Sequence, residues 1–186
     1  MAYCPITLAG INLDCENNKG GIKRVFIAPY GDVEGYKVDT DNTPEEGQTI
    51  DPTFGVITGF TMATGTTFKT YQFRKNTGSM TSTLTADETN GLNYVTTEVS
   101  LVFTKMDTAK RLEMAALSLG QLAVIVEDSN GKYWYVTPDD YASASAGGGE
   151  TGTAKGDRNA YTLTLSVEND GYPIEITADA VAQVIE

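Results

Sequence analysis

Hydrophobic and polar side chains alternate with a period of two residues along two long segments of the chain. In residues 93–103, NYVTTEVSLVF, the odd-numbered positions from Val95 to Phe103 form a mainly apolar face. This period is typical of half-buried β-strands, whose successive side chains point to opposite faces of a sheet. Residues 160–168, AYTLTLSVE, repeat the pattern with Tyr161, Leu163, Leu165 and Val167. The polar faces carry Thr96, Glu98 and Ser100 in the first segment and Thr162, Thr164, Ser166 and Glu168 in the second.

Weaker strand patterns occur along the rest of the chain. They are rich in β-branched and aromatic residues, which favour extended backbone. With 186 residues and 40% hydrophobic content, the chain is long enough for one domain with an ordinary core, so we expect a mainly β domain that spans residues 1–186. The weaker strands are predicted at residues 23–29, 60–74, 80–85, 173–177 (PIEIT) and 180–185 (AVAQVI), whereas residues 132–137 show one of the clearest strand patterns.

One helix is predicted between the strands, in the segment DTAKRLEMAALSLG. Asp107 or Thr108 is a suitable N-cap, and Gly120 is a suitable left-handed residue after the last turn. An apolar stripe at helical spacing is expected to lie on a sheet, and it consists of Ala109, Leu112, Ala116 and Leu119.

A β-hairpin is predicted directly after the helix, in LAVIVEDSNGKYWYVT. Two strand-forming runs flank Asn130 and Gly131, which both accept the positive φ angles of a type I′ turn. The same four residues, DSNG, imitate the start of a calcium loop. Because the twelfth loop position is Asp139 and not the bidentate Glu, the turn explains these residues better. In the second strand Trp134 alternates with Tyr133 and Tyr135, so one face of the hairpin is aromatic.

A long polar loop is predicted at residues 143–159, between two strands. Its sequence, SASAGGGETGTAKGDRN, is rich in small and flexible residues. Most connections in compact domains are only about 4–6 residues long, so a loop of this length needs a reason. A phosphate-binding loop does not fit, because Lys155 is followed by Gly156 and Asp157 and not by Ser or Thr.

Composition and charge narrow the classes of function. The chain has 13 basic and 25 acidic residues, a net charge of −12, which disfavours tight binding to nucleic-acid phosphates. It has no histidine, so Cys4 and Cys15 lack partners for the usual zinc sites; two free thiols or a small disulfide loop both fit. Asp139 and Asp140 are adjacent in extended backbone and point to opposite faces, so they are expected to be solvated turn residues. No catalytic residue, cofactor or metal site is predicted, and no signal peptide or membrane span, so a soluble protein made in a cytoplasm is expected.

The order of elements resembles the C-terminal half of bacteriophage major tail (tail tube) proteins. The resemblance lies in RLEMAALSLGQLAVIVEDSNGKYWYV, in the polar segment after it, and in GDRNAYTLTLSVENDGYPIEI. The start, CPITLAGINLDCENNKGGIKRVFIAPYGDV, is similar to structural proteins of phages and prophages of Bacteroides-type hosts. It is a resemblance of pattern and includes no catalytic motif.

The resemblance implies a β-sandwich or barrel-like fold of two packed antiparallel sheets with one flanking helix. It also implies homo-oligomeric rings, usually of six subunits, that stack into a tube through which DNA passes without specific binding. Other tail or head proteins are the further partners, and no membrane is involved. The protein would be a virion component synthesised in the cytoplasm of the bacterial host.

In that family a long loop reaches the neighbouring ring, which gives the predicted loop a reason. A flexible loop stays unordered in a monomer when it buries too little surface to offset its conformational entropy. The candidate inter-subunit residues are Ser143, Gly147, Gly148, Gly149, Glu150, Lys155, Asp157 and Arg158.

A DNA conduit needs a wall that is hydrated and does not attract phosphate, which hydroxyl and acidic side chains provide. The candidate lumen-facing residues are Glu98, Thr162, Thr164 and Glu168, which would equally suit an ordinary solvated face. Two other functions remain open from the sequence. The first is another virion component, such as a head decoration or head-tail joining protein. The second is a carbohydrate-binding or hydrolytic β-sandwich.

Overall fold

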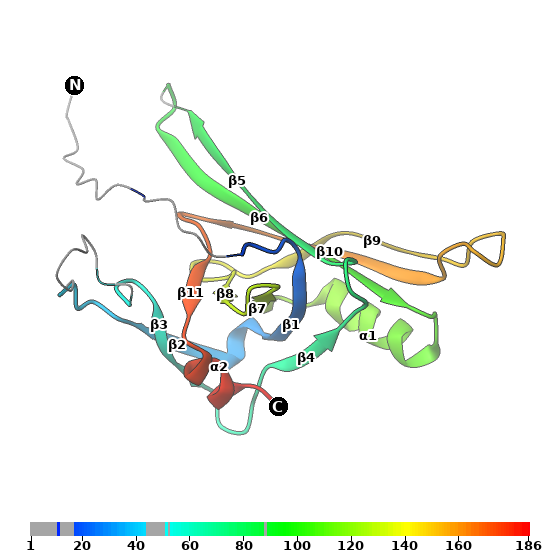
Figure 1. The fold of residues 1–186 in the computed structure, drawn as a ribbon, viewed down its shortest axis with the longest axis horizontal. Helices are drawn as coiled ribbons and strands as arrows, with labels where there is room; N and C mark the ends of the chain where they lie inside the picture. Colours follow the sequence, from blue (N-terminus) through cyan, green and yellow to red (C-terminus); the bar gives the residue numbers. More distant parts are fainter. Residues whose placement is uncertain (1–10, 12–16, 44–50, 52, 88) are drawn as a thin grey trace.

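The fold consists of two antiparallel sheets packed face to face, as predicted (Figure 1). The computed structural model describes residues 11, 17–43, 51, 53–87 and 89–186, so Cys4 and Cys15 lie outside the described residues. The larger sheet contains, in spatial order, β2 (Val33–Val38), β3 (Ile57–Met62), β11 (Ile174–Ile176), β8 (Tyr133–Tyr135), β7 (Leu122–Asp128), β1 (Ile22–Pro29) and β4 (Lys69–Gln72). The smaller sheet contains β5 (Ser79–Asp87), β6 (Leu92–Thr104), β10 (Ala160–Asn169) and β9 (Ser143–Glu150). Strands β11 and β3 pair in parallel, and the other pairs are antiparallel.

The main core fills the space between the two sheets. From the larger sheet, β1 and β7 contribute alternate residues, and from the smaller sheet β6 and β10 contribute the apolar faces that the sequence predicted. Val99 and Leu165 face each other across β6 and β10, and both are almost fully buried. The members of this cluster include Val25, Ile27, Val99, Leu101, Leu117, Val124, Val126, Leu163, Leu165 and Val167.

A second core covers the opposite face of the larger sheet. Phe26 on β1 and Ile125 on β7 point into it, together with Ile57 and Tyr135 from neighbouring strands. Helix α2 (Ala178–Val184) closes this core with Ala180, Val181 and Val184. Burial raises the pKa of Tyr135 to about 12. Strands β1 and β7 are therefore buried on both faces, which explains their nearly continuous apolar sequences.

The four-stranded sheet is longer than the body it packs on. Figure 1 shows the β5–β6 hairpin projecting beyond one end of the molecule and the β9–β10 hairpin projecting beyond the other. Strands β6 and β10 stay in register from Thr104↔Ala160 to Val95↔Asn169, so their alternating faces coincide along the whole pair. One face packs on the main core and the other faces solvent.

Three predicted elements differ from the structure. Residues 180–184 of the segment 180–185, which is predicted as a strand, belong to helix α2, and Ile185 forms a single bridge with Phe68. The described residues therefore contain two α-helices where one was expected. The N-cap of α2 is Thr177, whose hydroxyl accepts from the Ala180 amide at 3.3 Å, and its valines are buried at helical spacing. Residues 60–74 contain parts of β3 and β4, separated by a turn at Gly65, which has a positive φ. Residues 143–150 of the predicted loop form strand β9.

Helix α1 (Thr108–Leu119) begins where the sequence indicates but ends differently. The Asp107 side chain accepts from the Lys110 amide at 2.8 Å, and bonds from Lys110 hold the pKa of Asp107 below its usual value. Gly120 has φ −82, so the predicted left-handed cap is wrong. The backbone continues directly into β7 in extended form, and a Cβ at Gly120 would lie 2.9 Å from the Leu122 side chain.

The β7–β8 hairpin is confirmed, but its turn is not type I′. Gly131 has φ +88, whereas Asn130 is not among the non-glycine residues with positive φ. The Gly131 amide donates to the Asp128 carbonyl, and the Asp128 amide to the Lys132 carbonyl. These bonds define a three-residue loop with glycine in the left-handed position. The Asp128 carboxylate accepts from the amides of Asn130 and Lys132 at 2.8 and 2.9 Å, so it stabilises the turn.

We predict that Gly131→Val lowers the free energy of unfolding by about 1–3 kcal/mol, because a β-branched residue is strained at positive φ. The added side chain meets no atom within 4 Å, so the loss reports backbone strain alone. Urea unfolding monitored by circular dichroism measures it. Gly156→Val is the control, because Gly156 also has open space and no positive φ. Equal midpoints for the two variants would contradict the strained turn.

Candidate functional site

The solvent face of the four-stranded sheet carries mainly hydroxyl side chains, together with Leu92, Tyr94 and Val102 of β6. Each strand contributes one column of polar side chains to this face. The columns are Ser79, Thr81, Thr83 and Thr85 on β5; Thr96, Glu98 and Ser100 on β6; Thr162, Thr164, Ser166 and Glu168 on β10; and Ser143 on β9. We call this set the hydroxyl face. The four strands contain no Lys or Arg. The predicted lumen-facing residues Glu98, Thr162, Thr164 and Glu168 all lie on it.

Short polar contacts connect neighbouring columns of the hydroxyl face. Ser100 Oγ and Thr164 Oγ1 are 3.3 Å apart, and the Thr162 hydroxyl donates to the Gly148 carbonyl at 3.4 Å. Glu98 lies beside Ser166, and Glu168 lies beside Thr96, so the two acidic groups are on different rows. The face is therefore polar, acidic and free of converging groups that could bind one small ligand.

The two outer strands of this sheet present open backbone edges. In the part of the chain that the structure describes, β5 and β9 each pair on one side only. Strand β5 keeps an unbroken register from Ser79↔Ser100 to Asp87↔Leu92, and its single charge, Asp87, stands at its end. Strand β9 has one irregularity, at Ser145, and its single charge, Glu150, also stands at its end. Neither strand contains proline.

The outer strands of the larger sheet are different. Strand β2 carries Glu34 and Lys37 and has two register irregularities against β3. Strand β4 has only four residues and begins with Lys69. Charges, bulges and short length are the devices by which proteins prevent further strand pairing. The larger sheet has these protections, and the smaller sheet almost lacks them.

The glycine run of β9 is explained by its neighbours. A Cβ at Gly149 would lie 2.9 Å from the Tyr161 ring and 3.0 Å from Met106 Cε, so only glycine fits without displacing them. At Gly147 a Cβ would lie 3.3 Å from the Thr162 carbonyl oxygen. The prediction of a loop over residues 143–159 was wrong for β9, because glycine disfavours strands in general while cross-strand packing requires it here.

Residues 151–159 form the tip of the β9–β10 hairpin, and this part of the loop prediction is confirmed. Arg158 Nε donates to Glu150 Oε1, and one Asp157 oxygen accepts from the amides of Thr153 and Ala154, each at 2.7 Å. These amides hold the pKa of Asp157 below its usual value. Of the predicted inter-subunit residues, Lys155, Asp157 and Arg158 lie in the tip and the others in β9.

The predicted apolar stripe of helix α1 does not face a sheet. Leu112 is 58% exposed and Leu119 is 90% exposed, and Ala109 and Ala116 are exposed with them. The buried side of the helix contains Leu117 and the partly buried Met114. On that side the Tyr71 hydroxyl donates to Glu113, and burial is the main cause that raises the pKa of Tyr71. We call Ala109, Leu112, Ala116 and Leu119 the α1 stripe.

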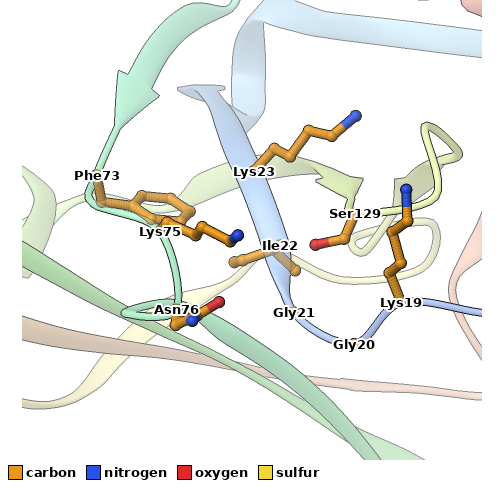
Figure 2. A pocket seen from close by; sticks show the side chains of 9 residues that line it. All are labelled: Lys19, Gly20, Gly21, Ile22, Lys23, Phe73, Lys75, Asn76 and Ser129. Atoms are coloured by element: carbon orange, nitrogen blue, oxygen red, sulfur yellow. The ribbon is translucent and has the colours of Figure 1, made fainter.

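An open hollow of about 520 Å³ lies at the start of β1. Figure 2 shows Ile22 and Phe73 on its floor and three lysines, Lys19, Lys23 and Lys75, around it. The ammonium groups point in different directions and do not converge on a common point. Lys23 Nζ lies 3.3 Å from Glu127 Oε1, so this lysine already has an acidic partner. The hollow lacks the arrangement of a catalytic centre.

The remaining candidate sites have structural roles. Asp128 supports the turn and accepts from Trp134 Nε1 at 3.2 Å, while Tyr133 and Tyr135 belong to the second core. Asp139 and Asp140 are exposed and accept from nearby backbone amides, as expected for turn residues. Among the described residues, no three His, Cys, Asp or Glu side chains come close enough together to hold a metal ion. No helix in the described part of the chain is long and apolar enough to span a membrane.

Comparison with protein-family models, with curated proteins and with solved structures finds no match to this chain. The geometry of the four-stranded sheet and of its edges is therefore the feature that indicates a function.

One buried charge holds β1 and β7 together beside the hollow. Glu127 on β7 is only 4% exposed, and its Oε2 accepts from Arg24 Nε at 2.6 Å. This hydrogen bond is the main cause that raises the pKa of Arg24. The guanidinium also lies 5.6 Å from the centre of the Phe26 ring. The Glu127 carboxylate on β7 thus binds two cations of β1, Lys23 and Arg24.

We predict that Glu127→Gln lowers the free energy of unfolding by about 1–3 kcal/mol, because it leaves Arg24 and Lys23 without their buried partner. The loss stays below that of a fully buried pair because both cations are partly exposed. Glu175→Gln is the matched control: it breaks the more exposed pair with Lys132 and should cost less than about 1 kcal/mol. Thermal unfolding at neutral pH compares the two, and equal losses would contradict the role of Glu127.

Proposed function

We propose that this protein is a structural subunit that joins copies of its four-stranded sheet edge to edge into a ring, and that stacked rings form a tube for DNA. The observation that carries the proposal is the pair of open edges, β5 and β9, on a sheet whose companion has protected edges. The resemblance to phage tail tube proteins implies the same assembly, with about six copies per ring. In this proposal the protein is a virion component and not an enzyme.

The strand order allows the sheet to continue from one copy to the next. With four antiparallel strands, β5 and β9 run in opposite directions. A copy related by rotation about a ring axis keeps its strand directions, so its β5 runs antiparallel to the β9 beside it. Each added copy therefore extends an antiparallel sheet. Open edges are satisfied on both sides only when such a sheet closes on itself.

Closure would place the hydroxyl face toward the lumen. The other face of the four-stranded sheet is covered by β1, β7 and helix α1, which are too bulky for the inside of a closed barrel. The wall would then present mainly Ser, Thr and Glu side chains, with Leu92, Tyr94 and Val102 among them, and no cation from its strands. Hydrated hydroxyls and carboxylates do not attract phosphate, so DNA would pass without adhering.

The β9–β10 tip is the element suited to contact the next ring. It projects beyond the body of the subunit, roughly along the strand direction (Figure 1). Its residues 151–159 are all exposed and contain both signs of charge. An exposed, ordered hairpin tip of this kind can dock on another copy without first having to fold.

A pair of proline variants tests the edge pairing. Successive backbone amides of a strand point to opposite sides of that strand. Of the variants Gly147→Pro and Gly148→Pro, one therefore removes a backbone hydrogen bond to β10, and the other removes only an amide at the open edge. We expect the variant that affects only the open edge to have the free energy of unfolding of the wild-type monomer, within about 0.5 kcal/mol, and to form no rings. Thermal unfolding of dilute protein identifies that variant, and sedimentation velocity with negative-stain microscopy measures assembly.

Two results would count against the proposal. Normal rings from a proline variant with wild-type stability would exclude β9 from the interface. A wild-type protein that stays monomeric at every concentration tested would exclude self-assembly altogether.

Replacement of residues 151–159 by a two-residue Asn-Gly turn tests the role of the tip. The monomer should keep its stability, because an exposed loop contributes little burial and loop closure depends only weakly on length. We expect single rings to form while long tubes disappear in electron micrographs. Tubes of wild-type length from the shortened protein would show that the tip does not connect rings.

A further inference from the structure

The α1 stripe is the largest departure of this fold from ordinary amphipathic packing. The helix turns Lys110 and Glu113 toward β4, where they line a small hollow with Tyr71, and it turns Leu112 and Leu119 toward solvent. Single exposed leucines are common on protein surfaces, but here two leucines and two alanines form one exposed stripe along a three-turn helix, beside the exposed Thr108, Arg111 and Ser118. Such a face indicates a surface that another molecule covers.

The helix lies along the open edge strand β9. At one end Met106, just before the helix, reaches the position of Gly149. At the other end the chain leaves the helix through Gly120 and bonds Leu122 to Ala142, immediately before β9. Helix and strand therefore run antiparallel, and a shallow hollow between them is lined by residues of both. The side of the helix that faces β9 carries Met114, Ala115 and Ser118, and the α1 stripe lies beyond them on the exposed side of the helix.

We propose that the α1 stripe is a docking surface for a second copy of this chain, the same copy whose β5 pairs with β9. This inference rests on the proposed edge pairing and adds a second contact to it. The occupant is a second copy because helix α1 lies along β9, the edge to which that copy's β5 would be added. A strand added to β9 must bring its own core-facing side chains to the side of the sheet where α1 lies.

The β5 edge carries the complementary side chain. Leu84 lies opposite Val95, on the core-facing side of the sheet, and it is 49% exposed on the edge strand whereas Val95 is buried. In the next copy this leucine would therefore lie on the α1 side of the continued sheet. Leu84 at the β5 edge of one copy would then contact Leu112 and Leu119 beside the β9 edge of its neighbour, which is a head-to-tail contact.

The rows of the sheet bring these leucines to the same place. One row crosses the four strands through Thr81, Glu98, Ser166 and Ser143. Continuing this row into the next copy places Thr81 of that copy beside Ser143, and its Leu84 beside residues 140 and 141. Tyr141 is exposed there, and Leu119 ends the helix at the same end of β9.

Ring closure adds a stagger between strands, which moves Leu84 along the helix. From Leu112 to Leu119 the stripe extends about 10 Å, roughly three strand residues, so it accommodates a shift of that size. The contact is heterologous, because each copy gives its hairpin to one neighbour and its helix to the other. Such contacts build rings, whereas helix-to-helix packing about a two-fold axis would stop at a dimer.

The double variant Leu112→Ser/Leu119→Ser tests the energetic part. Both side chains are largely exposed, so the dilute monomer should unfold at the wild-type temperature. The protein concentration needed for half-maximal assembly should rise at least about tenfold, because apolar burial at the interface is lost. Tyr172→Ser is the control, since Tyr172 is 58% exposed and lies between β10 and β11, away from the stripe. It should assemble like the wild type.

Cross-linking tests the identity of the contact. In a Cys4→Ser/Cys15→Ser protein, Leu84→Cys and Leu119→Cys are made separately and then mixed with a short bismaleimide. The mixture should give covalent dimers, and neither variant alone should. Dimers from Leu119→Cys alone would overturn the proposal in favour of a two-fold helix contact.

The outcomes separate this contact from the ring itself. If the serine double variant assembles like the wild type, the helix contact is wrong while edge pairing stands. If the wild-type protein stays monomeric, edge pairing and the helix contact fall together. Loss of assembly in the serine variant, with cross-links only in the mixture, supports both.

Discussion

Burial of β1 and β7 on both faces is the constraint on which the rest of the structure depends. Val25 and Phe26 are adjacent, point to opposite faces and are both fully buried, and Val124 and Ile125 repeat this on β7. A strand pair with two apolar faces needs a cover on each side. The four-stranded sheet covers one side, and α2 covers the other together with side chains of β2, β3, β8 and β11. Buried Glu127, bound by Arg24, joins the pair at its end.

This arrangement leaves the four-stranded sheet with a single packed face. Its strands are longer than the surface they cover, so both hairpins extend beyond the body (Figure 1). The open edges consequently belong to the sheet that has one packed face and one free face. Substitutions on the hydroxyl face change the surface without disturbing the packing of β1 and β7. In the proposed ring, this separation of the two faces allows the wall of the tube to be acidic and smooth while the core stays apolar.

The sequence predicted the elements whose pattern comes from one-sided burial. Strands β6 and β10 show period two because their other face is solvent. Strand β9 is not predicted because residues 147–149 are glycines, which disfavour strands. Packing against the Tyr161 ring on β10 requires glycine at position 149, and the local sequence of β9 does not show this contact. Helix α2 was missed because its Val-rich segment favours strands locally, whereas the core against Phe68 selects the helix. The α1 stripe is predicted to face the core because Leu112 and Leu119 are among the most apolar residues of the helix.

A single sequence does not separate burial within a chain from burial between chains. The open edges themselves depend on which strands are outermost, and only the topology shows that.

The glycines of β9 also make the two edge strands, β5 and β9, differ in how often they detach from the sheet. Each glycine in a strand costs about 0.5–1 kcal/mol relative to alanine, because it loses more conformational freedom. Strand β9 therefore detaches from β10 more often than β5 detaches from β6, which has a regular register and threonines along it. In the proposed assembly, the softer edge of a free subunit would be a poor template, so encounters between two free subunits would rarely succeed. An existing ring would hold β9 in place and remove this cost for the next subunit. The proposed tube would thus have a nucleation barrier, and its growth would begin on a preformed base rather than at random in solution.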